Sequence, residues 1–145
     1  PLVEAKNKFI FILDNYPNTD FALDAKFKLD FIENIIASKE MYLGRHYQKK
    51  GKWIAAINRF QYVVEEYEKT IFIEEALHRL VEINYQLGLE KESQRYATLL
   101  GYNYLSSDWY KKSYKIFNKN YEEKVAKKIN REKKGVIKRF QNLFD

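Results

Sequence analysis

Cysteine is absent from the 145-residue sequence, which excludes disulfide bonds, thiolate catalysis and cysteine-ligated metal sites. Proline and glycine are scarce, at two and five residues. Because these residues are the usual interruptions of a helix, their scarcity favours long helices joined by short connections. The sequence also has no apolar run close to the roughly 18–20 residues that a membrane-spanning helix needs.

Residues suited to catalysis or metal binding form no recognisable motif. Of the two histidines, His78 has Glu74 and Glu82 four residues to either side, so a helix places all three on one face. A weak metal site is one interpretation of this triplet, and a solvated face with i,i+4 pairs is the one we favour. The sequence holds no Gly-rich phosphate loop and no HExxH or GxSxG motif. We predict no catalytic residue, no bound metal and no cofactor.

The positive charge lies at one end of the chain. Residues 111–145 hold 12 Lys/Arg and 4 Asp/Glu, whereas residues 1–110 hold 14 and 16, so the balances are +8 and −2. We expect a helical body at 1–119 and a basic helical extension at 120–145. Three interpretations of the extension stay open: it caps the end of the body, docks on a partner, or binds anionic lipid or nucleic acid.

A short motif recurs three times, at the end of one expected helix and the start of the next. It reads Tyr-x-x-Thr/Ser-x-aromatic-x-x-x-small and begins at Tyr16, Tyr67 and Tyr104. The Thr or Ser, or a neighbouring Asp, is suited to cap the next helix, the aromatic residue to pack back, and the small residue to let helices approach. The spacings are 51 and 37 residues. The second fits a helical hairpin of about 34 residues, and the first is longer by almost four helical turns.

The middle of the chain carries a tetratricopeptide-like signature. Its positions are Gly44, Tyr47, Gly51, Trp53, Ala56 and Phe60. Small residues suit the contact between two antiparallel helices, Gly51 suits a turn with positive φ, and the aromatic residues fill the space between helices. We predict core packing for nearly all of the aromatic residues at helical or motif spacing, namely Phe9, Tyr16, Phe27, Phe31, Tyr47, Phe60, Tyr67 and Phe72.

These patterns predict an all-α fold of tetratricopeptide-like hairpins stacked as a short solenoid, with one extended helix near 20–50. The expected helices are 2–16, 20–50, 53–67, 71–87, 90–102, 107–119 and 121–143. The chain opens at Pro1, without Met, inside a helical pattern that lacks a hairpin partner. We therefore expect the C-terminal part of a longer array.

The run at 24–70 is DAKFKLDFIENIIASKEMYLGRHYQKKGKWIAAINRFQYVVEEYEKT. It looks like the long-helix repeat of the BamD family, tetratricopeptide-repeat lipoproteins of the bacterial outer-membrane β-barrel assembly machine. The segment YPNTDFALDA at 16–25 is similar to a family turn, and the turn before Trp109-Tyr110 looks like the ending of several relatives. The likeness covers about residues 1–115, and the extension at 120–145 has no counterpart.

The resemblance implies a non-catalytic interaction scaffold at the periplasmic face of the outer membrane, lipid-anchored in the full-length protein. It implies docking on the POTRA domain of the barrel subunit nearest the barrel. It also implies contacts with other assembly-complex lipoproteins, and with outer-membrane protein substrates mainly through N-terminal repeats missing from this chain. We expect no nucleic-acid partner. The alternatives are a generic tetratricopeptide adaptor and a binder of anionic membrane or nucleic acid through the basic extension.

The resemblance also implies a docking site. The family's docking arginine, in an Asn-Arg pair after the Gly-x-Trp turn, matches Asn58-Arg59, and Tyr62 and Glu66 follow on the same face. Arginine suits this role because its planar guanidinium can bind a carboxylate with two parallel hydrogen bonds. The alternative is an Arg59 that merely covers a helix face.

Overall fold

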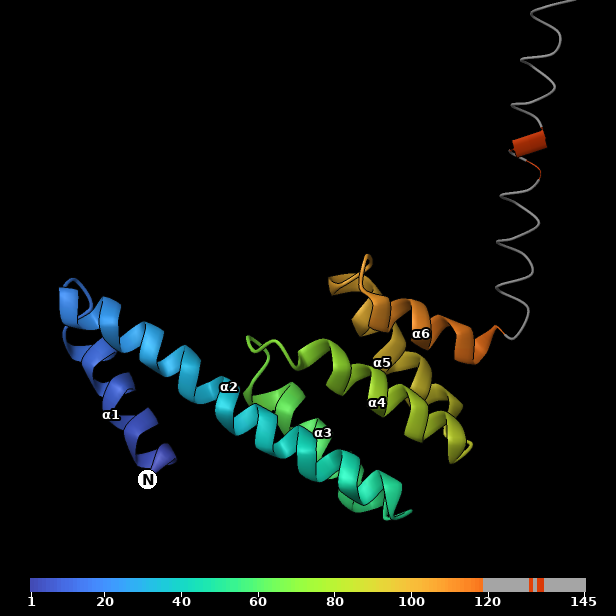
Figure 1. Ribbon diagram of the computed structural model, residues 1–145, viewed down its shortest axis with the longest axis horizontal. Helices are drawn as coiled ribbons and strands as arrows, with labels where there is room; N and C mark the ends of the chain where they lie inside the picture. Colours follow the sequence, from blue (N-terminus) through green and yellow to red (C-terminus); the bar gives the residue numbers. More distant parts are fainter. Residues whose placement is uncertain (119–130, 132, 135–145) are drawn as a thin grey trace, which may run out of the picture.

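The computed structural model describes residues 1–118 together with residues 131, 133 and 134, and within them it contains no strand. Its helices are α1 (Leu2–Asn15), α2 (Asp20–Lys49), α3 (Trp53–Glu66), α4 (Ile73–Gln86), α5 (Glu90–Asn103) and α6 (Asp108–Phe117). Neighbouring helices in the chain pack on one another, and α6 also packs on α4 (Figure 1). The predicted all-α, tetratricopeptide-like fold is confirmed. The predicted helix 121–143 and most of the basic extension lie outside the described residues.

Helix α2 is the extended helix that the sequence predicted, and it packs on both α1 and α3. Its first half packs against α1 and its second half against α3 (Figure 1). The hydroxyl Oγ1 of Thr19 caps its start by accepting from the backbone N–H of Ala22 at 3.2 Å. Gly51, at φ 68°, turns the chain into α3.

Among the residues described, no helix is long and apolar enough to cross a membrane.

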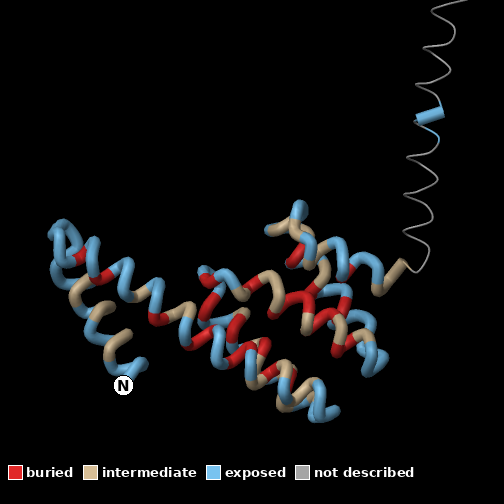
Figure 2. Tube along the Cα trace, in the orientation of Figure 1, coloured by how far each residue is buried: buried red, intermediate tan, exposed pale blue. Residues whose placement is uncertain are grey.

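The contact between α2 and α3 is close because Gly44 has no side chain. The ring of Phe60, which is fully buried, lies directly against the Gly44 backbone. Ala56 is also fully buried on α3, whereas Tyr47 and Trp53 are partly buried and pack against the core. Five of the six signature positions therefore gather at one helix–helix interface, and Gly51 lies in the exposed turn between the two helices. The buried residues concentrate where α2, α3, α4 and α5 meet (Figure 2).

The prediction of core packing is wrong for three aromatic residues. Tyr16, Phe27 and Phe31 are 55%, 65% and 68% exposed. The buried face of this half of α2 is formed by Ala22 and Ala25, and at 3.6 residues per turn Phe27 and Phe31 fall on the opposite side. Phe27 and Phe31 do have helical spacing, but they form a second apolar stripe on α2 that faces away from α1.

The recurring motif also fails at two of its positions. Phe21 is 78% exposed, so it does not pack back as predicted. Thr70 does not cap α4 with its side chain, because α4 begins only at Ile73, and the Thr70 hydroxyl instead donates to the Tyr67 carbonyl at 2.8 Å without accepting from an N–H at the helix start. At the third copy the prediction is confirmed: Ser107 Oγ accepts from the Trp109 N–H at 3.1 Å at the start of α6.

Candidate protein-docking groove

A groove with a volume of about 500 Å³ lies between the second half of α2 and the exposed side of α3. It is lined by Glu40, Tyr47, Ala55, Asn58, Arg59 and Tyr62. Three of the four predicted partner-binding residues, Asn58, Arg59 and Tyr62, are thus neighbours in space. Helix α3 places them together because positions 58, 59 and 62 lie within about one turn of each other.

Arg59 forms an ion pair with a carboxylate of α2. Its Nη1 donates to Oε2 of Glu40 at 2.8 Å. The Glu40 side chain is 10% exposed, whereas that of Arg59 is 42% exposed. The hydrogen bond and the negative charge of Glu40, together with Tyr47, raise the pKa of Arg59 above its ordinary value. The pair therefore places a permanently charged guanidinium at the surface, anchored to an acid that is nearly buried.

Glu40 is a site residue that the sequence analysis missed, although its position gave a signal. It follows Ile36 and Ala37 and precedes Met41 and Gly44, all of which are buried on α2. A charged residue inside such a stripe needs a partner, because a buried and unpaired carboxylate is costly. Nothing in the local pattern identifies Arg59, 19 residues further on, as that partner.

Tyr62 and Glu66 diverge at the end of α3. The Tyr62 ring packs edge-on against Tyr67, with centroids 5.5 Å apart. Burial, with a smaller effect of Tyr62, raises the pKa of Tyr67. Glu66 is exposed one turn beyond Tyr62 and lines a second groove of about 720 Å³, beside Leu29 of α2. The structure therefore does not bring Glu66 into the groove that contains Arg59.

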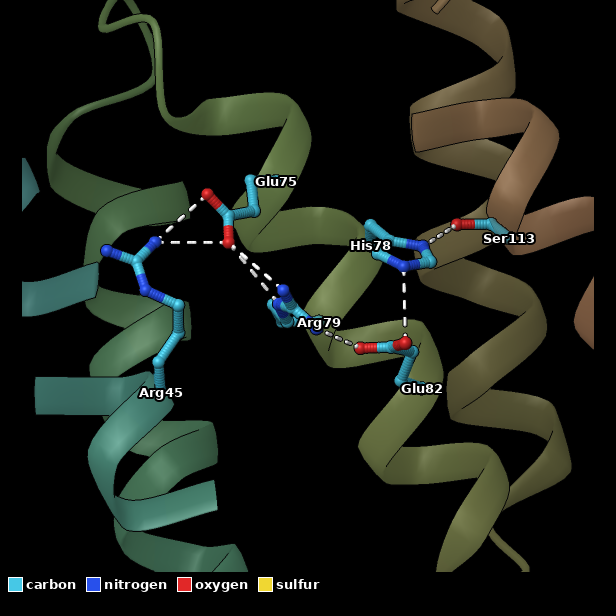
Figure 3. Close-up of polar contacts among 6 residues, drawn as sticks. All are labelled: Arg45, Glu75, His78, Arg79, Glu82 and Ser113. Atoms are coloured by element: carbon cyan, nitrogen blue, oxygen red, sulfur yellow. Dashed lines mark hydrogen bonds and ion pairs between the residues drawn. The ribbon is translucent and has the colours of Figure 1, made fainter. Parts of the chain in front are cut away.

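The face of α4 around His78 is buried, which contradicts the predicted solvated face. His78 is 3% exposed, its Nδ1 lies 2.7 Å from Oγ of Ser113 on α6, and its Nε2 lies 3.3 Å from Oε1 of Glu82 (Figure 3). The reason is that α6 packs on this side of α4. Glu74 points elsewhere and accepts from the Ser107 hydroxyl. Among the described residues, no group of three or more His, Asp or Glu side chains is arranged to hold a metal ion.

A chain of ion pairs connects α2 to this face of α4. Arg45 Nη1 lies 3.0 Å from Oε2 of Glu75, Arg79 contacts Glu75 at 3.3 Å, and Arg79 also contacts Glu82 at 2.8 Å (Figure 3). Burial raises the pKa of the Glu82 carboxyl, but His78 and Arg79 outweigh burial and lower it to about 2. The pairs within α4 join residues three or four apart, so the sequence indicates them. The pair between Arg45 and Glu75 joins residues 30 apart, and the sequence gives no sign of it.

Stacked helical hairpins with an arginine-bearing surface groove define a tetratricopeptide-like helical-repeat protein. A family model described as YfiO, outer membrane lipoprotein, matches residues 1–99. The chain therefore belongs to the YfiO family of outer-membrane lipoproteins.

Named relatives support this membership. The chain is 43% identical over 118 residues to outer membrane protein assembly factor BamD of Rickettsia prowazekii, covering 81% of this chain and 47% of the relative. It is 42% identical over 109 residues to the Caulobacter vibrioides protein of the same name, covering 75% and 36%. A third BamD, from Neisseria meningitidis, is 34% identical over 83 residues, covering 57% and 31%. The chain thus spans less than half the length of these relatives.

Proposed function

We propose that the chain is part of a non-catalytic scaffold of the outer-membrane β-barrel protein assembly complex. The proposal is supported by membership of an outer-membrane lipoprotein family and by relatives named as outer membrane protein assembly factors. Under this proposal the chain works at the periplasmic face of the outer membrane, and the full-length protein is lipid-anchored. Its partners include the barrel subunit and other lipoproteins of the complex, and substrates contact mainly N-terminal repeats of the full-length protein.

The groove between α2 and α3 is the proposed docking site for the POTRA domain nearest the barrel. The observation that carries this assignment is that Asn58, Arg59 and Tyr62 line one groove. Arg59 is half-exposed and fully charged, so it suits a carboxylate on the partner. Asn58 adds an amide that can donate and accept, and Tyr62 adds an aromatic surface. This combination of arginine, tyrosine and a polar rim is typical of residues that dominate protein interfaces.

A binding measurement with matched arginine variants tests this assignment. The full chain is titrated with the purified POTRA domain, and Arg59→Ala is compared with Arg95→Ala. Arg95 lies on α5, its side chain is 60% exposed and it does not line the groove, so the control removes the same charge from outside the proposed site. We expect Arg59→Ala to weaken binding by at least about tenfold and Arg95→Ala to have little effect.

Equal binding by the parent and the Arg59→Ala variant would reject the groove as the docking site. Failure of the parent to bind would reject this partner and favour a generic helical-repeat adaptor. Thermal melting of each variant separates lost contacts from lost folding.

A further inference from the structure

The Arg59–Glu40 pair bears on how the groove recognises its partner. We propose that Glu40 is a positioning residue, which holds Arg59 so that the free edge of its guanidinium meets a partner carboxylate. This inference rests on the proposed docking function and adds to it a residue that does not itself touch the partner.

The geometry of the pair leaves Arg59 able to bind a second acid. The contact with Glu40 uses Nη1 and a single carboxylate oxygen, Oε2. A guanidinium carries five N–H donors in one plane, and Nη2 with Nε forms a separate edge suited to two parallel hydrogen bonds. Arg59 therefore can hold Glu40 on one side and a partner carboxylate on the other.

Glu40 is fixed while Arg59 is half in solvent. The Glu40 side chain is 10% exposed and lies in the tightly packed part of α2, next to Met41 and one turn before Gly44. A long arginine side chain at a surface otherwise samples many rotamers, and ordering it on binding opposes association. An anchor that orders Arg59 in the free protein removes part of that cost. Tyr47, which also lines the groove, is a smaller cause of the raised pKa of Arg59.

The charge of Glu40 and its anchoring role predict opposite effects on affinity. If Glu40 acted only as a negative charge, neutralising it would strengthen the attraction between the groove and an acidic partner. If Glu40 positions Arg59, neutralising it weakens binding although the groove becomes more positive. The sign of the change therefore separates the two roles.

The experiment measures the affinity of the full chain for the purified POTRA domain nearest the barrel. The variants are Glu40→Gln, which keeps the shape, Glu40→Leu, which fills the same space without an acceptor, Arg59→Ala, and the Glu40→Leu/Arg59→Ala double variant. We expect affinity to fall from the parent to Glu40→Gln to Glu40→Leu, by about tenfold overall. The double variant should bind no more weakly than Arg59→Ala, because Glu40 acts through Arg59. Asp30→Asn, an exposed acid on the same helix outside this groove, is the charge-matched control and should change affinity less than about twofold.

A second measurement does not need the partner. Nitrogen-15 relaxation of the Arg59 Nε–H group in the free chain reports its order on the picosecond–nanosecond scale. We expect an ordered group in the parent and a clearly more mobile one in Glu40→Leu.

The outcomes separate the two proposals. Unchanged or tighter binding by Glu40→Leu, with binding still lost in Arg59→Ala, overturns the positioning role and leaves the docking site in place. An Arg59 group that is equally mobile in the parent and in Glu40→Leu also overturns it. A parent that does not bind, or an Arg59→Ala variant that binds like the parent, overturns the docking function itself.

Discussion

A β-carbon on Gly44 would lie 2.5 Å from Cε1 of Phe60, so the backbone of α2 rests on the aromatic ring of α3. Phe60 is fully buried, and its ring is enclosed by the core where α2, α3 and α4 meet. This close contact between a missing side chain and a large one therefore helps to set the position of α3 along α2. Glu40 and Arg59 lie one turn and one residue from these two positions, so the same contact lies next to the proposed docking groove.

Gly44→Ala is expected to destabilise the protein. Alanine favours a helix over glycine by about 1 kcal/mol, but overpacking a filled core costs about 1–3 kcal/mol. We expect a net loss of about 1 kcal/mol in the free energy of unfolding, measured by urea denaturation. In a Phe60→Leu background, which creates room, the same substitution should become neutral or stabilising. A higher unfolding midpoint for Gly44→Ala in the parent would contradict the packing argument.

Gly101→Ala is expected to be far milder, although the geometry is similar. A β-carbon on Gly101 of α5 would lie 2.5 Å from Cε2 of Tyr110 on α6. Unlike Phe60, Tyr110 is only partly buried, so its ring can move away. The helix preference of alanine then offsets the displacement, and we expect a change within about 0.5 kcal/mol. Denaturation under the same conditions compares Gly101→Ala with Gly44→Ala. A loss of stability in Gly101→Ala that equals or exceeds the loss in Gly44→Ala would contradict this prediction.

Glu82 is expected to make stability depend on pH in the acid range. Its pKa in the folded protein is lowered from 4.5 to about 2, so its contribution is complete above pH 4.5 and is lost as the pH falls towards 2. We expect the stability difference between the parent and Glu82→Gln, on the order of 1 kcal/mol at neutral pH, to shrink over this window. Denaturation midpoints measured between pH 7 and pH 2 give this difference.

Glu92→Gln is the matched control for the pH measurement. Glu92 also pairs with an arginine one turn away, but both side chains are more than half exposed. We expect its difference from the parent to be small at every pH. A Glu82→Gln difference that stays constant from pH 7 to pH 2 would show that its carboxylate gains no stability from His78 and Arg79.

Thr19→Ala is expected to loosen the start of α2. The Thr19 hydroxyl accepts the Ala22 N–H, and loss of such a cap costs about 1 kcal/mol. Amide hydrogen exchange should become faster at Ala22 and Leu23, near the helix start, before it changes elsewhere. Thr19→Ser retains the acceptor and should exchange like the parent. Unchanged exchange in Thr19→Ala would mean that the packing of α1, rather than the cap, holds this end.

The sequence determined the helices, because their signals are local. Periodic apolar residues, the caps at Thr19 and Ser107, and a glycine with positive φ at Gly51 each act within a few residues. The extra length of the first repeat was likewise enough to predict the extended α2. Asn58, Arg59 and Tyr62 were also predictable as neighbours, since they share one helix.

Only the tertiary structure decided which faces of these helices are covered. Periodicity shows that Phe27 and Phe31 share a face with each other, but whether a neighbouring helix covers that face depends on contacts far along the chain. The same holds for His78, which is buried because α6 packs over α4, and for Glu40, whose partner comes from the next helix. A local pattern fixes the shape and polarity of a helix surface, whereas its partner is selected by the packing of all helices together.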